Sequence, residues 1–124
     1  MNVEDIVTRQ ELSEYVGAGG DGCFIHTNNE VVGIAMNPRL NPDAPGILLV
    51  GKGPRREIYA VNFLEDGDYV PTFVKQGTDQ WKYMGDFRAV RIDRSEATIA
   101  EQSQRSGRKD IWGVMYLEQH NGVI

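Results

Sequence analysis

The sequence predicts an α+β fold in which a small, mostly antiparallel β-barrel carries two flanking helices. Short stretches rich in β-branched and aromatic residues recur about every 8–12 positions between turn residues, as in small closed sheets. Helical spacing coincides with capping residues in two segments, one near each end. A chain of 124 residues, 40% hydrophobic and 25% charged, is typical of one ordered domain, here residues 1–124.

The first predicted helix spans residues 9–16. Thr8 and Glu11 have the spacing of a capping box, in which each side chain accepts a hydrogen bond from the other residue's backbone N–H. Leu12 begins an apolar face with helical spacing. Gly17 is the residue type that commonly ends a helix, so the helix is short and amphipathic.

The chain then changes to a strand pattern. Residues 23–36 predict a hairpin with its turn at Thr27–Glu30. Three prolines in residues 37–46 predict a rigid extended loop, because each ring fixes φ and biases the preceding residue away from helix. The apolar run from Ile47 to Val50 predicts a buried strand.

The second half of the chain continues this pattern. Residues 57–64 alternate with period two, which predicts a strand, followed by a hairpin turn at Glu65–Asp68. Gly85 suggests a β-bulge. Asp93 or Ser95 caps a second helix that Gly107 ends. By residue range, the remaining elements are strands at 69–75, 81–85, 86–92 and 111–117 and the helix at roughly 96–106.

Charge and hydropathy limit the function classes. The formal net charge is −5, and the whole acidic excess lies in residues 1–51. This argues against a purely electrostatic nucleic-acid binder, although it allows a local basic face. The apolar runs are far shorter than a membrane span, and no secretory signal is visible, so a cytoplasmic protein without a membrane partner is expected. The single cysteine, Cys23, excludes an internal disulfide framework.

Two glycine-rich loops are candidate ligand contacts. The sequence GAGGDG from Gly17 to Gly22 matches G-x-G-x-x-G, but a helix precedes it and a strand follows, the reverse of a dinucleotide site. It is either a helix end leading into a strand or a loop whose backbone approaches a ligand. The loop from Gly51 to Arg56 carries three cations and either binds phosphate through arginine and backbone N–H groups or is a solvated turn.

Trp81 and Tyr83 share one face of a predicted strand, because side chains alternate along a strand. Such a pair belongs either to the core or to a wall on which a planar ligand, such as a base, stacks. Asp86 follows at the predicted bulge, where a carboxylate accepts hydrogen bonds from a base amino group or serves as a turn residue.

Catalytic groups are scarce. Cys23 and His26 are predicted on opposite strand faces, which disfavours a nucleophilic dyad. Glu65, Asp66 and Asp68 are able to hold a metal, but a hairpin turn explains them better. We therefore expect no enzymatic activity and no cofactor.

Four segments resemble a known family. They are the glycine-rich entry to an aromatic strand at Gly19–Phe24, the turn at Val50–Pro54, the strand VPTFVK at Val70–Lys75 and the strand WKYMGDFRA at Trp81–Ala89. Together they are similar to the PUA-like, and especially SRA-like, domains that accompany nucleases in modification-dependent restriction systems. The resemblance implies a curved barrel that holds one flipped nucleotide in an aromatic pocket.

The resemblance also implies residue roles. Trp81 and Tyr83 would form the base pocket with Phe24, and Asp86 would recognise the base edge. The phosphate-binding side chains would be Lys52, Arg55, Arg56, Lys75, Arg88 and Arg108. Charge at a helix C-terminus is an equally good explanation for Arg108.

The expected function is therefore a non-enzymatic nucleic-acid-binding module that recognises a modified base, with DNA favoured over RNA. A nuclease domain or subunit is the expected protein partner. The alternative is a protein-interaction or regulatory module whose acidic N-terminal region, including Glu11 and Glu14, meets a basic partner. A small-molecule enzyme using Asp21, His26 and Asp86 is a weaker third interpretation.

Overall fold

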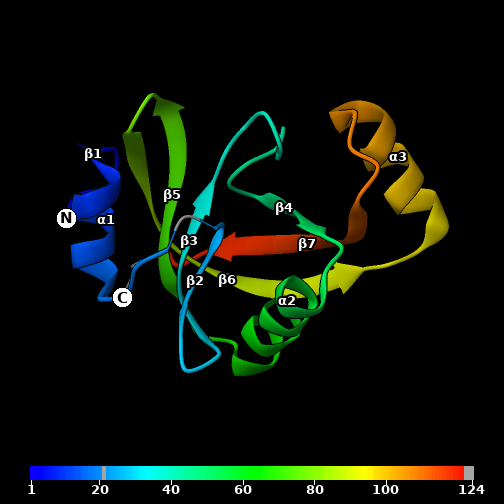
Figure 1. The fold of residues 1–124 in the computed structure, drawn as a ribbon, viewed down its shortest axis with the longest axis horizontal. Helices are drawn as coiled ribbons and strands as arrows, with labels where there is room; N and C mark the ends of the chain where they lie inside the picture. Colours follow the sequence, from blue (N-terminus) through cyan, green and yellow to red (C-terminus); the bar gives the residue numbers. More distant parts are fainter. Residues whose placement is uncertain (21, 122–124) are drawn as a thin grey trace.

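The computed structural model describes residues 1–20 and 22–121, which form one curled, mixed β-sheet with three helices (Figure 1). The sheet has the shape of a half-barrel rather than a closed barrel. Along the sheet the strands are β2 (Phe24–Thr27), β3 (Glu30–Met36), β5 (Val70–Gly77), β6 (Gln80–Asp93), β7 (Ile111–Gln119) and β4 (Ile47–Gly51), and β1 (Ile6–Val7) pairs with β6. No helix in the described residues is long and apolar enough to cross a membrane.

Helix α2 (Pro54–Asp66) makes the sheet mixed. It carries the chain from β4, at one edge of the sheet, back to β5, which pairs parallel to β3. Its Tyr59, Ala60 and Phe63 are buried against one face of the sheet and form the main core there. The sheet curls around this helix because burial of its apolar stripe is the dominant stabilising contribution.

The strand expected at residues 57–64 and the hairpin turn expected at Glu65–Asp68 are both wrong, because these residues belong to α2. Pro54 at the first helical turn and Gly67, with φ +66°, mark its ends. The buried positions 59, 60 and 63 follow the helical period, and the adjacent pair 59 and 60 does not fit the alternation that a strand requires. The protein thus has three helices where the sequence predicted two.

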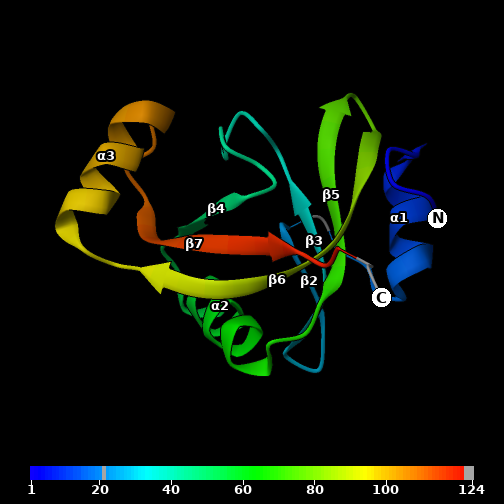
Figure 2. The same cartoon turned by 180° about the vertical axis from the view of Figure 1, so that it is seen from behind.

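Helix α1 (Arg9–Val16) covers the opposite face of the sheet, and the complete capping box at Thr8 and Glu11 confirms the prediction for this helix. Its Leu12 packs in a second core cluster. The other buried members of that cluster are Ile25, Ala35, Phe73 and Tyr83. Helix α3 (Glu96–Ser106), capped by Ser95 and ended by Gly107 as predicted, contacts β7 at the far end of the sheet (Figure 2).

The other predictions have mixed outcomes. The 23–36 hairpin and the strands at 47–50, 69–75 and 111–117 are confirmed, with small changes of boundary. The two strands expected around Gly85 are one strand, β6, and the predicted bulge is present because Thr72 faces Gly85 while Phe73 faces Tyr83. Residues 37–46, which we name the proline loop, form consecutive hydrogen-bonded turns rather than an extended segment.

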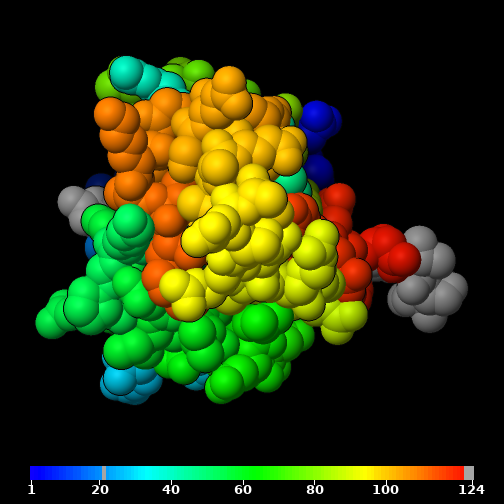
Figure 3. Space-filling view, turned by 90° about the vertical axis from the view of Figure 1, so that its right-hand side faces the viewer, coloured from blue at the N-terminus to red at the C-terminus, as the bar shows by residue number. Residues whose placement is uncertain are grey.

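Figure 3 shows the molecule from the α3 end, where α2 (green) and α3 (yellow to orange) cover separate parts of the surface. On the sheet face opposite α2, α1 lies at one end and α3 at the other (Figures 1 and 2). The proline loop lies between them, and the candidate site lies beside it.

Candidate nucleic-acid interface

A cavity of about 410 Å³ lies between the start of α1 and the proline loop. Its walls come from both of these segments, from β3, β5 and β6, and from the residue before β2. The lining residues are Arg9, Cys23, Ala35, Asn37, Leu40, Asn41, Lys75, Asp79 and Trp81. Its size falls in the range of about 300–1,000 Å³ that is usual for small-molecule sites.

Trp81 forms an aromatic wall of this cavity and carries cations on its ring. The guanidinium of Arg9 lies 4.8 Å from the indole centroid, and the Lys75 ammonium lies 5.8 Å from it. Arg9 is held in place because it donates hydrogen bonds of 2.9–3.2 Å to the carbonyls of Gly20 and Gly22. No carboxylate of the described residues forms an ion pair with Lys75. The wall therefore combines a stacking surface with positive charge.

Polar groups for recognising a ligand edge lie around this wall. The Asn37 side-chain oxygen accepts from the Arg39 backbone N–H at 3.0 Å, so its amide nitrogen is oriented and, within the described chain, has no partner. One Asp79 carboxylate oxygen accepts from the Arg9 backbone N–H at 2.8 Å, which leaves the other oxygen available. The cavity thus offers one amide donor and one carboxylate acceptor.

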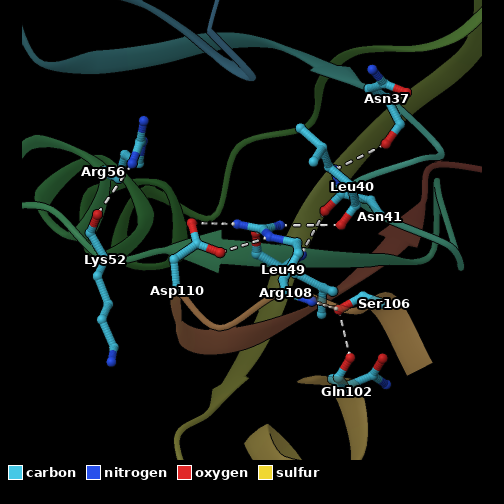
Figure 4. Close-up of polar contacts among 10 residues, drawn as sticks. All are labelled: Asn37, Leu40, Asn41, Leu49, Lys52, Arg56, Gln102, Ser106, Arg108 and Asp110. Atoms are coloured by element: carbon cyan, nitrogen blue, oxygen red, sulfur yellow. Dashed lines mark hydrogen bonds and ion pairs between the residues drawn. The ribbon is translucent and has the colours of Figure 1, made fainter. Parts of the chain in front are cut away.

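Asn41, which lines the cavity, and Arg108, which does not, fix the proline loop through hydrogen bonds (Figure 4). Buried Asn41 accepts from the Leu49 backbone N–H at 2.8 Å. Arg108 donates to the carbonyl of Leu40 at 3.1 Å and to that of Leu49 at 3.0 Å. Its Nε and Nη2 bind both carboxylate oxygens of Asp110 at 2.9 and 3.1 Å. These contacts tie the proline loop to β4 and to the start of β7.

The structure separates the four residues predicted for the base pocket. Trp81 lines the cavity, whereas Tyr83 is buried beneath α1 and its hydroxyl donates to Asp86 at 2.6 Å. Burial and this contact with Asp86 raise the pKa of Tyr83 well above its ordinary value. Phe24 belongs to the α2 side of the sheet, where its ring contacts Phe63.

The predicted phosphate-binding residues lie at four separate locations. Lys52, Arg55 and Arg56 lie together and exposed at the start of α2, and Lys75 lines the cavity. Arg88 binds Glu118 at 2.6 Å and packs over the Tyr69 ring, away from the cavity. The guanidinium of Arg108 makes the internal contacts described above. We therefore leave Arg108 out of the proposed phosphate contacts.

Cys23 lies at the edge of the cavity as a neutral thiol. Burial raises its pKa to about 11, although the charges of Arg108, Arg56 and Arg9 oppose this shift. A thiol with such a pKa carries very little thiolate at neutral pH and is a poor nucleophile. Within the described chain no hydrogen bond joins Cys23 to His26, whose ring instead stacks on Tyr59 with the centroids 4.0 Å apart.

An acidic group lies elsewhere, at the C-terminal end of α2. Carboxylate oxygens of Glu30, Asp66 and Asp68 lie within 4.8 Å of one another, so Glu30 takes the place that the sequence suggested for Glu65. These residues are able to hold a cation. All three are exposed, however, and exposed acidic groups often come together without binding a metal.

Sequence reasoning missed most of the cavity. Arg9, Asn37, Leu40, Asn41 and Asp79 were not singled out as site residues, because none of them belongs to a recognisable motif. The asparagines of the proline loop were the only local hint. Comparisons with protein-family models, curated proteins and solved structures give no match for this chain.

Proposed function

We propose that this protein is a nucleic-acid-binding module that holds one base of a strand in the cavity beside Trp81. The observation that carries the proposal is an indole wall flanked by Arg9 and Lys75 in a cavity of about 410 Å³. Stacking on an aromatic side chain contributes about 1–3 kcal/mol per base. The adjacent cations suit the phosphates that accompany every base of a strand.

The cavity also has the groups needed for selectivity. The Asn37 amide donates to a ring nitrogen or carbonyl oxygen of the base, and Asp79 accepts from an exocyclic amino group. Ala35 and Leu40 provide apolar contacts suited to a methyl group on the base. This combination favours a modified base over its unmodified counterpart, and a base displaced from its stack over one within a duplex.

Charge outside the cavity guides the strand. Lys52, Arg55 and Arg56 form a basic group at the start of α2, and Lys75 adds a charge inside the cavity. Neutralising three or four phosphates of a single strand gives a slope of about −2 to −3 in log K against log salt. The net charge of −5 opposes non-specific binding to nucleic acid. Most of the binding free energy must therefore come from contacts in the cavity.

Fluorescence anisotropy tests this proposal. The probes are matched DNA duplexes and single strands with cytosine, 5-methylcytosine, 5-hydroxymethylcytosine, N6-methyladenine or phosphorothioate links, at low and moderate salt. We expect salt-sensitive binding that prefers one modified probe and weakens about 5-fold to 150-fold in Trp81→Leu, the equivalent of one stacked base.

Trp112→Leu is the matched control. Trp112 is also half-buried and also carries an arginine on its ring, with Arg94 at 4.1 Å, but it does not line this cavity. Unchanged binding in this variant is expected. Absence of binding to every probe, or equal losses in both variants, would refute the proposal.

A second candidate is a protein-interaction module, which the N-terminal surface favours. Val3 and Ile6 are 53% and 57% exposed, and half-exposed Tyr15 lies on nearby α1 together with Glu11 and Glu14. Exposed apolar residues with an acidic rim are typical of a contact surface for a basic protein. Glu14→Lys would weaken binding to such a partner and leave the Trp81 cavity unchanged, whereas Glu11 stays in place because it closes the capping box of α1.

A further inference from the structure

A second and smaller cavity, of about 200 Å³, lies on the α2 side of the sheet at the start of β2. Its walls are the glycine-rich segment before β2, the first residues of β2 and one side of α2. The lining residues are Gly19, Gly20, Gly22, Cys23, Phe24, His26, Arg56 and Tyr59. The volume is below that of most small-molecule sites and suits a single small group.

The two cavities are neighbours. Cys23 lines both of them. Arg9 also connects them, because its guanidinium packs on Trp81 and donates to the carbonyls of Gly20 and Gly22. The backbone that walls the second cavity is therefore fixed to the aromatic wall of the first. Cys23 and Arg9 therefore lie between the two cavities.

Three side chains of the second cavity, those of Arg56, His26 and Tyr59, are hydrogen-bond donors that form no ion pair with the described residues. Arg56 donates one hydrogen bond, from Nη1 to the Lys52 carbonyl at 3.1 Å, and forms no ion pair within the described chain. The His26 ring and the Tyr59 hydroxyl have no hydrogen-bond partner among the described residues, and their rings stack. Asp110 acts electrostatically on Arg56, but its carboxylate is already bound by Arg108.

The glycines leave space rather than fill it. A Cβ at Gly19 or Gly22 would meet no other atom within 4 Å, and neither residue has a positive φ. Neither packing nor backbone conformation therefore explains why these positions lack side chains. A ligand that approaches the backbone closely does explain it.

We propose that the second cavity binds a phosphate group of the strand whose base occupies the Trp81 cavity, an inference that rests on the proposed function. The Arg56 guanidinium supplies the positive charge and a two-pronged donor set, which matches phosphate oxygens. His26 adds a donor from β2, and the Tyr59 hydroxyl adds one from α2, the helix that carries Arg56. The base and the phosphate are then bound on either side of Cys23.

Titration with inorganic phosphate tests the site without nucleic acid. The chain has two histidines, and only His26 lines the cavity, so His120 serves as an internal control. At fixed pH, with chloride keeping the ionic strength constant, NMR should show a saturable shift of the His26 ring signals with a millimolar midpoint. The His120 signals should follow the chloride control.

Variants identify the donor. Arg56→Gln should weaken the His26 response at least 5-fold, whereas Arg55→Gln, which changes the neighbouring exposed arginine outside this cavity, should keep it within 2-fold. Gly22→Leu should fill the space and abolish the response without loss of the native circular dichroism spectrum. An unresponsive His26, or equal losses in the two arginine variants, overturns the proposal.

Oligonucleotides separate this inference from the proposed function. If strands bind through Trp81 while phosphate leaves His26 unchanged, the nucleic-acid function stands and the phosphate site is refuted. If phosphate shifts His26 but no strand binds, the anion site is supported and the nucleic-acid function is refuted. If both hold, Arg56→Gln should also lower the preference for a short strand with a 5′-phosphate over the same strand with a 5′-hydroxyl.

Discussion

Arg108→Gln should destabilise the protein strongly, although the sequence placed Arg108 among exposed phosphate ligands. Its side chain is only 14% exposed. It donates to the carbonyls of Leu40 and Leu49 and to both carboxylate oxygens of Asp110 (Figure 4). Glutamine is shorter and cannot reach both carbonyls, so the proline loop would lose its anchor to β4.

The structure gives the size of this effect. A hydrogen bond that involves a charged group contributes about 1.5–3 kcal/mol when it is shielded from water. Asp110 is 53% exposed, so its ion pair adds no more than about 1 kcal/mol. The bond to the Leu49 carbonyl is partly buried and contributes about 1.5 kcal/mol, whereas the bond to the Leu40 carbonyl is exposed and contributes about 0.5 kcal/mol, so the free energy of unfolding should fall by about 2 kcal/mol. For a chain of this length that corresponds to a Tm lower by about 8 °C.

Arg105→Gln is the matched control for urea unfolding followed by circular dichroism. Arg105 also holds the proline loop, through a two-pronged ion pair with Asp43, but its side chain is 46% exposed. Solvent screening leaves such an exposed pair with little net contribution to stability. If Arg108→Gln costs no more than Arg105→Gln, the guanidinium is not an internal anchor and its assignment to phosphate binding must be restored.

Three further predictions concern single positions. Stability should fall between pH 9 and pH 11, because the unfolded Cys23 thiol loses its proton near 9.0 while the folded thiol keeps it to about 11; urea unfolding of Cys23→Ala should show a weaker decline. Gly85→Ala should cost about 1–3 kcal/mol in the same assay, because φ is +104° and the new Cβ would lie 2.7 Å from the Gln119 amide nitrogen. Arg55→Glu should raise the free energy of unfolding by about 0.3–1 kcal/mol and weaken strand binding in anisotropy, since a negative charge at the start of α2 suits its dipole.

Local chemistry explains which elements the sequence predicted correctly. Helix α1 carries a capping box, and α3 carries Ser95 and Gly107 at its ends, so both are recognisable from a few neighbouring residues. Helix α2 has Gly53 as its N-cap, so no side-chain cap marks its start, and Pro54 and Gly67 are its local end signals. Its exposed apolar residues, Ile58 and Val61, hide the helical period of the buried positions from a reading of the sequence.

The parallel pairing of β3 with β5 could not be predicted because α2 was taken for a strand. When residues 57–64 are taken for a strand and Glu65–Asp68 for a hairpin turn, the next strand is expected to pair antiparallel with the preceding one. A nearly closed antiparallel barrel follows from that pairing. The helix instead supplies the crossover connection that a parallel pair requires. One misassigned element therefore changed both the helix count and the closure of the sheet.

The candidate site was predictable only in its aromatic part. Trp81 stands out because of its neighbours along the strand, but Arg9, Asn37 and Asp79 are far apart in the sequence and meet only in the folded sheet. Tyr83 shares a strand face with Trp81, as expected, yet α1 covers it. Periodicity identifies a face, whereas the coverage of that face depends on where a distant helix packs.

The charges of α2 offer an argument that does not depend on the cavities. Helix α3 follows the preference of the helix dipole, with Glu96 in its first turn and Arg105 in its last. Helix α2 has Arg55 and Arg56 at its start beside one acidic residue, Glu57, and ends in Glu65 and Asp66, with no basic residue in its last turn. Each misplaced charge at a helix end costs about 0.3–1 kcal/mol.

Within the described chain, no ion pair offsets the two arginines at the start of α2. Among the described residues, the one hydrogen bond that their side chains make is from Arg56 to the Lys52 carbonyl, so folding gains little from these cations at a helix terminus that favours anions. A bound phosphate would turn this cost into a stabilising interaction, because the arginine side chains and the positive end of the helix dipole both attract it. Departures from local stability rules are expected at functional positions, and this one lies at Arg56, where α2 meets the second cavity.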